Sequence, residues 1–253
     1  MNNFSEQSAL YAQYRPRYPK ELLNEIYRHV VRKHNVWDCG TGNGQLADKL
    51  ALKFQKVYAT DISKEQLDRA ILKNNITYIQ NSAENPIFEN EMFDLITVAQ
   101  AIHWFDFELF YEEVLRTSKK NGVLAVIGYG RLKTDSKTTK TISDFYDKMF
   151  KSHFSENREY VEKGYRTIPF PFEEIGYFEY SSTYDWELKE LQGYLQSWSA
   201  VQKFREINKF DPTEKIITKM STTWTSKKTI EFPVFLRLGR IKPAANRVDG
   251  RGR

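Results

Sequence analysis

The chain has 253 residues, 40% of them hydrophobic and 15% aromatic, which allows one large domain with a sizeable core. Its single cysteine, Cys39, excludes an internal disulfide framework and a multi-cysteine zinc site, and its four histidines form no H-E-x-x-H motif, so we predict no metal. The net charge of +5 resides largely in residues 240–253, where five basic residues face one acidic residue, so it gives little support to a nucleic-acid partner.

The first predicted element is a helix over residues 20–33, preceded by an N-terminal segment, residues 1–19. Pro19 suits a position just ahead of a helix because its fixed φ is already close to the helical value. Apolar residues at helical spacing give this helix one face toward the core. They are Leu22, Leu23, Ile26 and Val30.

A glycine-rich loop follows the first predicted strand, residues 36–39, and a helical pattern then begins at Gln45. The loop consists of Gly40, Thr41, Gly42, Asn43 and Gly44. Glycines let a ligand approach the backbone closely, and a loop that opens a helix presents free N–H groups to that ligand. The next apolar run, 57–60, ends on Asp61, whose carboxylate can accept hydrogen bonds from both hydroxyls of a ribose. These features indicate a nucleoside pocket.

Two other nucleotide-binding motifs do not fit this loop. The dinucleotide fingerprint requires a third glycine where Gln45 stands, and the Gly-Lys-Ser/Thr of nucleotide hydrolases is absent. What remains is D-x-G-x-G-x-G, starting at Asp38, with an acid 17 positions after Gly44. This pattern resembles the cofactor motif of class I S-adenosyl-L-methionine (SAM) dependent methyltransferases. The resemblance implies that Asp38, the glycine loop, Asp61 and Ile62 bind SAM and its product S-adenosyl-L-homocysteine (SAH).

The resemblance continues through the next three predicted strands, 76–80, 93–99 and 123–128. A helix over 106–119 and a turn at 120–122 connect the last two. Residues after the first of these strands are similar to the step with which the family holds the adenine, and the end of the second faces the cofactor in the family. The residues implied are Ser82, Ala83, Glu84, Ala99 and Gln100.

Alternation of strand and helix through residue 130 predicts a parallel sheet wound on both faces. Residues 131–172, with a helical run near 139–151, break this alternation and are expected to be a cap insert. A strand over 178–184, helical segments over 187–207 and 212–222, and a strand over 229–238 follow. We therefore expect an α/β fold, a doubly wound, mainly parallel seven-stranded sheet of the Rossmann-like methyltransferase type. In this family the last strand lies antiparallel beside the fifth.

The predicted organisation is one methyltransferase domain over residues 1–240, followed by a tail, 241–253, that is expected to be mobile. Within the domain we distinguish a lid segment (1–19), the core (20–130), the cap insert (131–172) and C-terminal strands and helices (173–240). The lid assignment comes from a further resemblance: residues 11–19 and 195–201 are similar to a methyltransferase subgroup that includes trans-aconitate methyltransferase. In that subgroup the first segment folds over the cofactor.

The subgroup resemblance also implies substrate or lid residues: Tyr11, Tyr14, Arg15, Trp104 and Trp198. Arg15 could pair with the carboxylate of SAM or of an acceptor, because its planar fork matches a carboxylate; the alternative is a surface arginine stiffened by Pro16. Tyr11 and Tyr14 could instead pack on the sheet edge, and Trp104 and Trp198 could be core aromatics.

Methyl transfer is an in-line displacement at an activated carbon, so alignment of the reactants is the main contribution required of the protein. A carboxylate acceptor is already ionised at pH 7, whereas an alcohol, phenol or ammonium acceptor must lose a proton. His103 is the only histidine near the expected site, and we predict that it is the catalytic residue. Its role stays open between a base, a hydrogen-bond donor to a small acid, and a packing residue beside Trp104.

Several methyltransferase chemistries are excluded by absent residues. No Asn/Asp-Pro-Pro-Tyr/Phe loop follows residues 93–99, no paired glutamates lie there, and Cys39 lies within the glycine motif where it cannot act as a nucleophile. We therefore expect a SAM-dependent methyltransferase that acts on a small molecule, at oxygen and with a carboxylate among the candidate acceptors. The alternatives are an RNA or protein methyltransferase with the same core, a protein that binds SAM without catalysis, and an NAD oxidoreductase, which Gln45 disfavours.

Partners and location follow from what the sequence lacks. No apolar stretch approaches the roughly 20 residues that span a bilayer, and the N-terminus has no basic start and apolar run of a secretory signal. We expect a cytoplasmic enzyme, monomeric or homodimeric, with a small-molecule acceptor, no membrane partner and no nucleic-acid partner.

Overall fold

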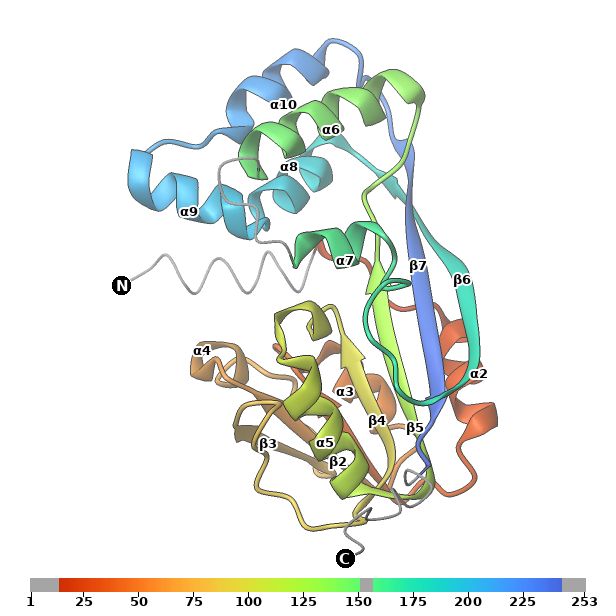
Figure 1. The fold of residues 1–253 in the computed structure, drawn as a ribbon. Coiled ribbons are helices and arrows are strands. Elements are labelled where there is room, and N and C mark those ends of the chain that lie inside the picture. Colours follow the sequence, from red (N-terminus) through yellow and green to blue (C-terminus); the bar gives the residue numbers. More distant parts are fainter. Residues whose placement is uncertain (1–13, 151–156, 243–253) are drawn as a thin grey trace, which may run out of the picture. The chain divides into compact units, whose positions relative to one another are not determined.

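The computed structural model describes residues 14–150 and 157–242 of the chain (Figure 1). These divide into two compact units: among the described residues, unit 1 comprises 14–19, 129–150, 157–164 and 179–235, and unit 2 comprises 20–128, 165–178 and 236–242. Tyr11 and the tail from residue 243 onward, both included in the sequence predictions, lie outside the described residues.

A seven-stranded sheet has the order β3-β2-β1-β4-β5-β7-β6. Its first five strands pair in parallel. The strands are β1 (Asn35–Cys39), β2 (Lys56–Asp61), β3 (Ile76–Gln80), β4 (Phe93–Ala99), β5 (Ser118–Tyr129), β6 (Glu173–Trp186) and β7 (Lys228–Arg240). An antiparallel bridge between Lys133 and Glu231, just beyond β5, indicates that β7 runs against β5. The predicted fold class is confirmed, including the reversed strand beside the fifth.

Unit 2 has helices on both faces of the parallel strands. They are α2 (Lys20–His29), α3 (Gln45–Leu50), α4 (Lys64–Leu67) and α5 (Phe107–Thr117). Figure 1 shows α5 in front of the sheet and α3 behind it. The chain moves from β1 to β2 in one direction along the sheet and from β4 to β5 in the other, so right-handed connections place the two helices on opposite faces. Because both faces are covered, β1 and β4 are buried along nearly their whole length.

Trp37 lies at the centre of this core. Its ring is fully buried and contacts the rings of Phe88, Phe93 and Phe110 at centroid distances of 5.5, 5.9 and 6.1 Å. Its indole N–H donates to Thr60 Oγ1 at 2.9 Å, so the one polar atom of the side chain is satisfied. This packing fixes β1 against β2 directly below the glycine loop.

Several predicted boundaries are wrong; β6, for instance, begins at Glu173 instead of residue 178. The first helix ends at His29 instead of residue 33, where the β-branched residues Val30 and Val31 follow. The residues expected to form a turn, 120–122, lie inside β5, whose register with β4 shifts between Phe93 and Leu95. The helical segment 187–207 is two helices, α8 (Leu188–Gln196) and α9 (Ser199–Asn208), because Trp198 adopts an extended backbone conformation.

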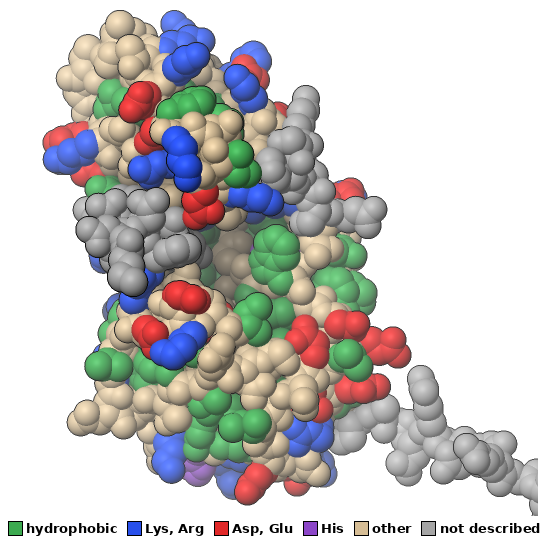
Figure 2. All heavy atoms as spheres, turned by 90° about the vertical axis from the view of Figure 1, so that its left-hand side faces the viewer, with side chains coloured by type: hydrophobic (Ala, Val, Ile, Leu, Met, Phe, Trp, Pro, Cys, Tyr) green, Lys and Arg blue, Asp and Glu red, His purple; other side chains and the backbone are tan. Residues whose placement is uncertain are grey.

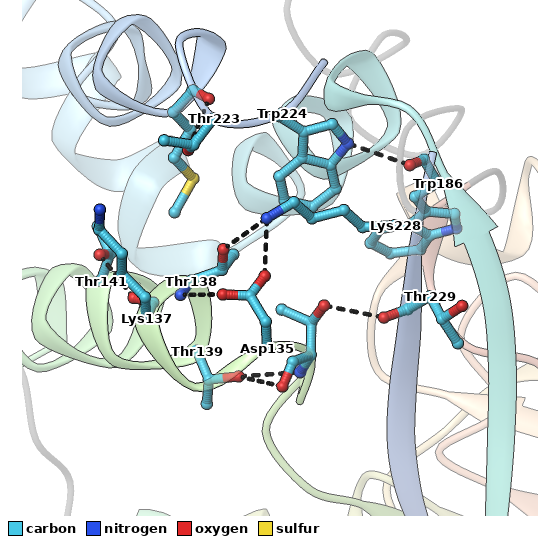
Figure 3. Close-up of polar contacts among 12 residues, drawn as sticks. Asp135, Lys137, Thr138, Thr139, Thr141, Trp186, Thr223, Trp224, Lys228 and Thr229 are labelled. Carbon is cyan, nitrogen blue, oxygen red and sulfur yellow. Dashed lines mark hydrogen bonds and ion pairs between the residues drawn. The ribbon is translucent and has the colours of Figure 1, made fainter. Parts of the chain in front are cut away.

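Unit 1 contains the remaining helices, α6 (Ser136–Phe150), α7 (Arg158–Glu162), α8, α9 and α10 (Thr213–Ser221). The start of α6 is tied to the start of β7 through Asp135 (Figure 3). The Asp135 carboxylate accepts from the backbone N–H of Thr138 at 3.0 Å and from Lys228 Nζ at 2.7 Å. Lys228 also lies over the Trp224 ring, whose N–H donates to the Trp186 carbonyl. None of the helices in the described ranges is long and apolar enough to cross a bilayer.

Candidate functional site

The predicted cofactor residues gather at one edge of unit 2. Asp38 lies in β1 next to its end, Asp61 ends β2, Ser82 follows β3, and Ala99 ends β4. Because these strands are parallel neighbours, their carboxyl ends lie along the same edge. The sheet order reverses between β1 and β4, which is where open α/β sheets bind ligands. The sequence pattern and the topology therefore indicate the same place.

Asp38 supports the glycine loop from below. Its buried carboxylate accepts hydrogen bonds from Thr41 Oγ1 at 2.5 Å and from Thr97 Oγ1 at 2.7 Å. Burial raises the pKa of Asp38 to about 6, although both hydroxyl hydrogen bonds act to lower it. Asp38 thus fixes the loop to β4.

The three loop glycines all have positive φ, at +67° for Gly40, +58° for Gly42 and +82° for Gly44. A Cβ on Gly44 would lie 2.1 Å from the hydroxyl of Tyr78 on β3. The Tyr78 side chain therefore occupies the space that a side chain at position 44 would need. A Cβ on Gly42 would meet nothing within 4 Å. Gly42 therefore has open space at its Cα, where a ligand can lie against the backbone.

Asp61 is the half-buried acid beside this open space. Its carboxylate accepts from the backbone N–H of Gly42 at 2.8 Å and from that of Ser63 at 2.9 Å. Each carboxylate oxygen has a second lone pair that can accept from a ribose hydroxyl. The next residue, Ile62, has 73% of its surface exposed and offers an apolar face beside the acid. These residues fit the adenosine part of SAM: an acid for the ribose, an apolar side chain and bare backbone.

The segment after β3 is held between two parts of this edge. The backbone N–H of Asn81 donates to the Asp61 carbonyl at 3.1 Å, and the Asn81 side chain accepts from Ser82 N. Ala83 is buried, and the Glu84 carboxylate accepts from the backbone N–H of Asp106 at 3.2 Å. Ser82, Ala83 and Glu84 thus lie between the end of β2 and the start of α5.

The residues after β4 pack against the glycine loop. Gln100 has a left-handed backbone with φ of +55°, a strained conformation for a residue with a side chain. A Cβ on Gly40 would lie 2.5 Å from that of Ala101, so this segment and the loop are in direct contact. A short helix, η1 (Ile102–Trp104), follows and carries His103 and Trp104.

His103 and Trp104 have opposite environments. The imidazole is buried, and its Nδ1 lies 2.7 Å from the hydroxyl of Tyr165. Trp104 has 61% of its surface exposed, although its ring lies 4.8 Å from that of His103. The reading of Trp104 as a core aromatic is therefore wrong, and its exposed indole is accessible to a ligand.

The remaining predicted residues lie in unit 1. Arg15 donates from Nη1 to the Tyr129 hydroxyl and from Nη2 to the Ser197 carbonyl, both at 3.0 Å. Tyr14 packs on α8, where a Cβ on Gly193 would lie 2.3 Å from its ring. Trp198 is buried against the rings of Tyr146 and Tyr194, so within unit 1 it is a core residue.

Sequence reasoning missed three residues that shape this site: Thr97, Tyr78 and Tyr165. Thr97 had a signal, because it is a polar residue among the apolar residues of the second half of β4, and a buried polar group usually has a hydrogen-bond partner. The sequence signal for Tyr78 was weaker, because the alternation of residues along β3 does not say which face of the strand lies toward the glycine loop. Tyr165 had none, because it is 62 residues from His103 in the chain.

Surface charge bears on the nature of the acceptor. Figure 2 views the molecule from the side on which α4 and β3 lie in Figure 1. Figure 2 shows Lys, Arg, Asp and Glu side chains mixed over this face, with Asp and Glu gathered at its right-hand edge and hydrophobic side chains exposed between them. A nucleic-acid surface normally concentrates basic residues on one face. The mixed charge on this face gives no support to a nucleic-acid partner.

Known proteins with similar sequences and structures point to one family. Residues 37–126 match the family model described as a methyltransferase domain. A candidate methyltransferase of Dictyostelium discoideum is 30% identical over 249 residues, covering 94% of this chain and 95% of that protein. A Saccharomyces cerevisiae protein assigned as a SAM-dependent methyltransferase is 27% identical over 132 residues, 49% of this chain and 45% of that protein.

A solved structure gives the same result. That of a candidate type II methyltransferase from Anaeromyxobacter dehalogenans has a TM-score of 0.80 and 31% identity, covering 91% of this chain and 99% of that one. Both its fold and its chain length therefore correspond to the present protein.

Proposed function

We propose that this chain, which belongs to the class I SAM-dependent methyltransferases, methylates a small molecule at oxygen, and that the methylated group is a carboxylate. The observation that carries the choice of a carboxylate is the guanidinium of Arg15. It is held by Tyr129 and Ser197 and lies 5.7 Å from the centroid of the Tyr194 ring. A cation fixed in this way, with an aromatic side chain beside it, suits a planar anion.

The residues of unit 2 support the transfer by binding and orientation. When bound, the cofactor supplies a methyl group activated by the adjacent sulfonium. Asp61 and the backbone of Gly42 would hold the ribose end, and Ser82, Ala83 and Glu84 would flank the adenine. Fixing the donor leaves alignment of the acceptor oxygen as the main remaining requirement.

A carboxylate acceptor removes the need for a base, because it is ionised at pH 7. We propose that Arg15 pairs with an anionic group of the acceptor. This follows the resemblance of residues 11–19 and 195–201 to the trans-aconitate methyltransferase subgroup. The roles of segment 1–19 as a lid and of 131–172 as a cap belong to the same proposal.

The proposal is tested by incubating the full chain with SAM that carries a labelled methyl group, together with panels of small di- and tricarboxylic acids, phenols, amines, a short RNA and a mixed peptide pool. We expect label in acid panels only, released by mild base as methanol, which identifies a methyl ester. Label in RNA or peptide would favour the macromolecular alternative. SAM binding without label in any panel would favour a protein that binds SAM without catalysis.

Arg15→Lys and Arg15→Gln variants test the acceptor contact. We expect KM for the acid to rise about 10-fold or more in Arg15→Gln, the loss of one charged hydrogen-bonded contact, with SAM affinity unchanged. Arg17→Gln is the matched control, since Arg17 is an exposed arginine of the same segment. An equal effect of both variants would contradict a specific role for Arg15.

A further inference from the structure

A cavity of about 360 Å³ lies at the amino ends of β4 and β5, on the side of the unit 2 sheet away from the glycine loop. It is lined by Val31 and Arg32 from the segment after α2, by Asp94 of β4, and by residues 119–122 of β5. The length of β4 separates the two edges of the sheet by roughly 20 Å. The cavity is therefore separate from the candidate cofactor site, and its volume is within the range of small-molecule sites.

An irregularity in the sheet forms one wall of this cavity. The register between β4 and β5 shifts, so that Asp94 alone faces residues 119–122. Consecutive residues of a regular strand point to opposite faces, yet Lys119 and Lys120 line the same cavity. Bulges of this kind redirect side chains out of the regular alternation. The bulge therefore brings two neighbouring lysines into one wall.

The cavity wall has an excess of positive charge. Asp94 is the only acid among the lining residues, and its carboxylate accepts from Lys119 Nζ at 2.9 Å and from the backbone N–H of Asn35 at 3.0 Å. Lys119 thus neutralises Asp94. Arg32 and Lys120 are exposed, and neither has an ion pair or a side-chain hydrogen bond in the described part of the chain. Two positive charges of the wall are left without a counter-charge.

The end of α2 does not reverse this balance. The last carbonyls of a helix carry a partial negative charge, which would disfavour an anion nearby. Here cations bind them: Arg240 Nη1 donates to the His29 carbonyl at 3.2 Å, and Lys33 Nζ donates to the Val30 carbonyl at 3.0 Å. Arg240 Nη1 also donates to the Asn121 carbonyl at 3.1 Å. Arg240 thus joins the two walls of the cavity and adds to its positive charge.

We propose that this cavity binds a small phosphate monoester, and that Arg32 and Lys120 recognise its phosphate. A phosphate monoester carries nearly two negative charges above pH 7, which matches the two uncompensated cations. Arginine binds phosphate through parallel N–H donors, and lysine binds it as a point charge. Val31 has 89% of its surface exposed and provides an apolar wall for the organic group of the ester. Because the site is separate from the candidate cofactor site, its ligand does not depend on the proposed function.

Three probes test this site: phenyl phosphate, inorganic phosphate and benzoate. Backbone NMR titrations of the full chain at pH 8 and constant low ionic strength follow the signals of Arg32, Lys120 and Gly42. We expect phenyl phosphate to shift Arg32 and Lys120 saturably and to leave Gly42 unchanged. Inorganic phosphate, which lacks the apolar group, should bind more weakly. Benzoate has the same ring but one charge, and should bind at least about 10-fold more weakly.

Three results of these titrations would overturn the proposal. The first is the absence of saturable shifts at Arg32 and Lys120 with phenyl phosphate. The second is saturation at Gly42 instead, which would place the ligand at the cofactor edge. The third is equal affinity for benzoate and phenyl phosphate, which would show that the second charge is not recognised.

Arg32→Gln and Lys120→Gln each remove one uncompensated charge and should weaken phenyl phosphate binding about 5-fold or more. Lys56→Gln is the matched control. Lys56 is also exposed and lies at the amino end of β2, on the same edge of the sheet but outside the cavity. Its loss should leave the affinity at the wild-type value. An equal loss of affinity in Lys56→Gln would show general attraction to a charged edge and would overturn the site, as would wild-type affinity in both cavity variants.

Discussion

The Asp61 carboxylate accepts a hydrogen bond from the backbone N–H of Gly42 at 2.8 Å. This contact joins the end of β2 to the one loop glycine whose Cα faces open space. The acid and the bare backbone of the loop are therefore held at a fixed spacing.

Asp61→Asn should weaken SAM and SAH binding about 10- to 100-fold, the loss of charge-assisted hydrogen bonds to a ribose. The amide keeps one acceptor oxygen for the loop, so the fold should be retained. Calorimetric titration measures the change. Asp68→Asn, at an exposed acid of the same segment, is the control and should bind as the wild type does. Equal affinity of Asp61→Asn and the wild type would contradict the ribose contact.

Gly42→Ala and Gly44→Ala should separate binding from stability. Both positions have positive φ, which costs a residue with a side chain about 1 kcal/mol. At Gly44 the new methyl would also lie 2.1 Å from the Tyr78 hydroxyl, so this variant should be clearly less stable. At Gly42 the methyl enters open space, so the variant should fold but bind SAM about 10-fold or more weakly, because the methyl keeps the ligand off the backbone.

Urea unfolding and calorimetric titration of both glycine variants provide the readings. Tyr78→Phe in the Gly44→Ala background should recover part of the stability, because it removes the atom nearest to the new methyl. Full affinity for SAM in a folded Gly42→Ala variant would show that the ligand does not lie against this loop.

Asp38→Asn should alter how stability depends on pH. The pKa of Asp38 is raised to about 6 in the folded protein by burial, above its ordinary value of 3.8. Between these two values the folded chain holds a proton that the unfolded chain has lost, so raising the pH through this window destabilises the wild type. A shift of about two units corresponds to about 3 kcal/mol.

The stability of Asp38→Asn relative to the wild type should therefore increase from pH 4 to pH 7, because only the wild type loses stability through the titration of Asp38. Urea unfolding at several pH values measures it, and contributions from other groups cancel in the difference. The amide can still accept from one threonine and donate to the other, so the loop contacts persist. A difference that does not vary with pH would contradict a raised pKa.

The pair of Asp135 and Lys228 should contribute modestly to the stability of unit 1. Hydrogen bonds from Lys228 and from the Thr138 backbone lower the pKa of Asp135 to about 2, so its contribution is present above pH 4 and is lost as the pH falls toward 2. Its side chain is 47% exposed, and solvent screening limits the coupling to about 1 kcal/mol or less. A double-mutant cycle with Asp135→Asn and Lys228→Met measures the coupling.

The exposed pair of Lys140 and Asp144 on the same helix is the matched comparison for that cycle. Its coupling should be about 0.3 kcal/mol, the usual value for a helical pair four residues apart. Equal coupling energies for the two pairs would contradict the expectation that the less exposed pair of Asp135 and Lys228 is the more strongly coupled.

The local parts of the site were predictable from the sequence because they depend on short spacing. The glycine loop, the helix at Gln45 and Asp61 belong to one strand-loop-helix-strand unit. In such a unit the backbone conformation of the loop requires glycine, so the sequence pattern itself marks the loop. The parallel sheet covered on both faces followed from the alternation of strands and helices, whereas its seven strands and reversed last strand followed from the family resemblance.

Contacts between distant segments were not predictable in the same way. Tyr165 reaches His103 through a connection with no regular periodicity, held by Arg237 on the last strand. The early end of α2 at His29 was also missed, because apolar spacing continued to Val30 although the helix did not. Periodicity identifies faces of elements, whereas pairing between loops depends on the whole fold.

The central claim is that the loop from Gly40 to Gly44, together with Asp61, binds SAM. Calorimetric titration of the folded wild type with SAM and with SAH, each compared with Asp61→Asn, tests it most directly. We predict saturable binding of both ligands by the wild type and binding at least about 10-fold weaker by the variant. Absence of heat with either ligand in folded wild-type protein, or equal affinity in the two proteins, would contradict the claim.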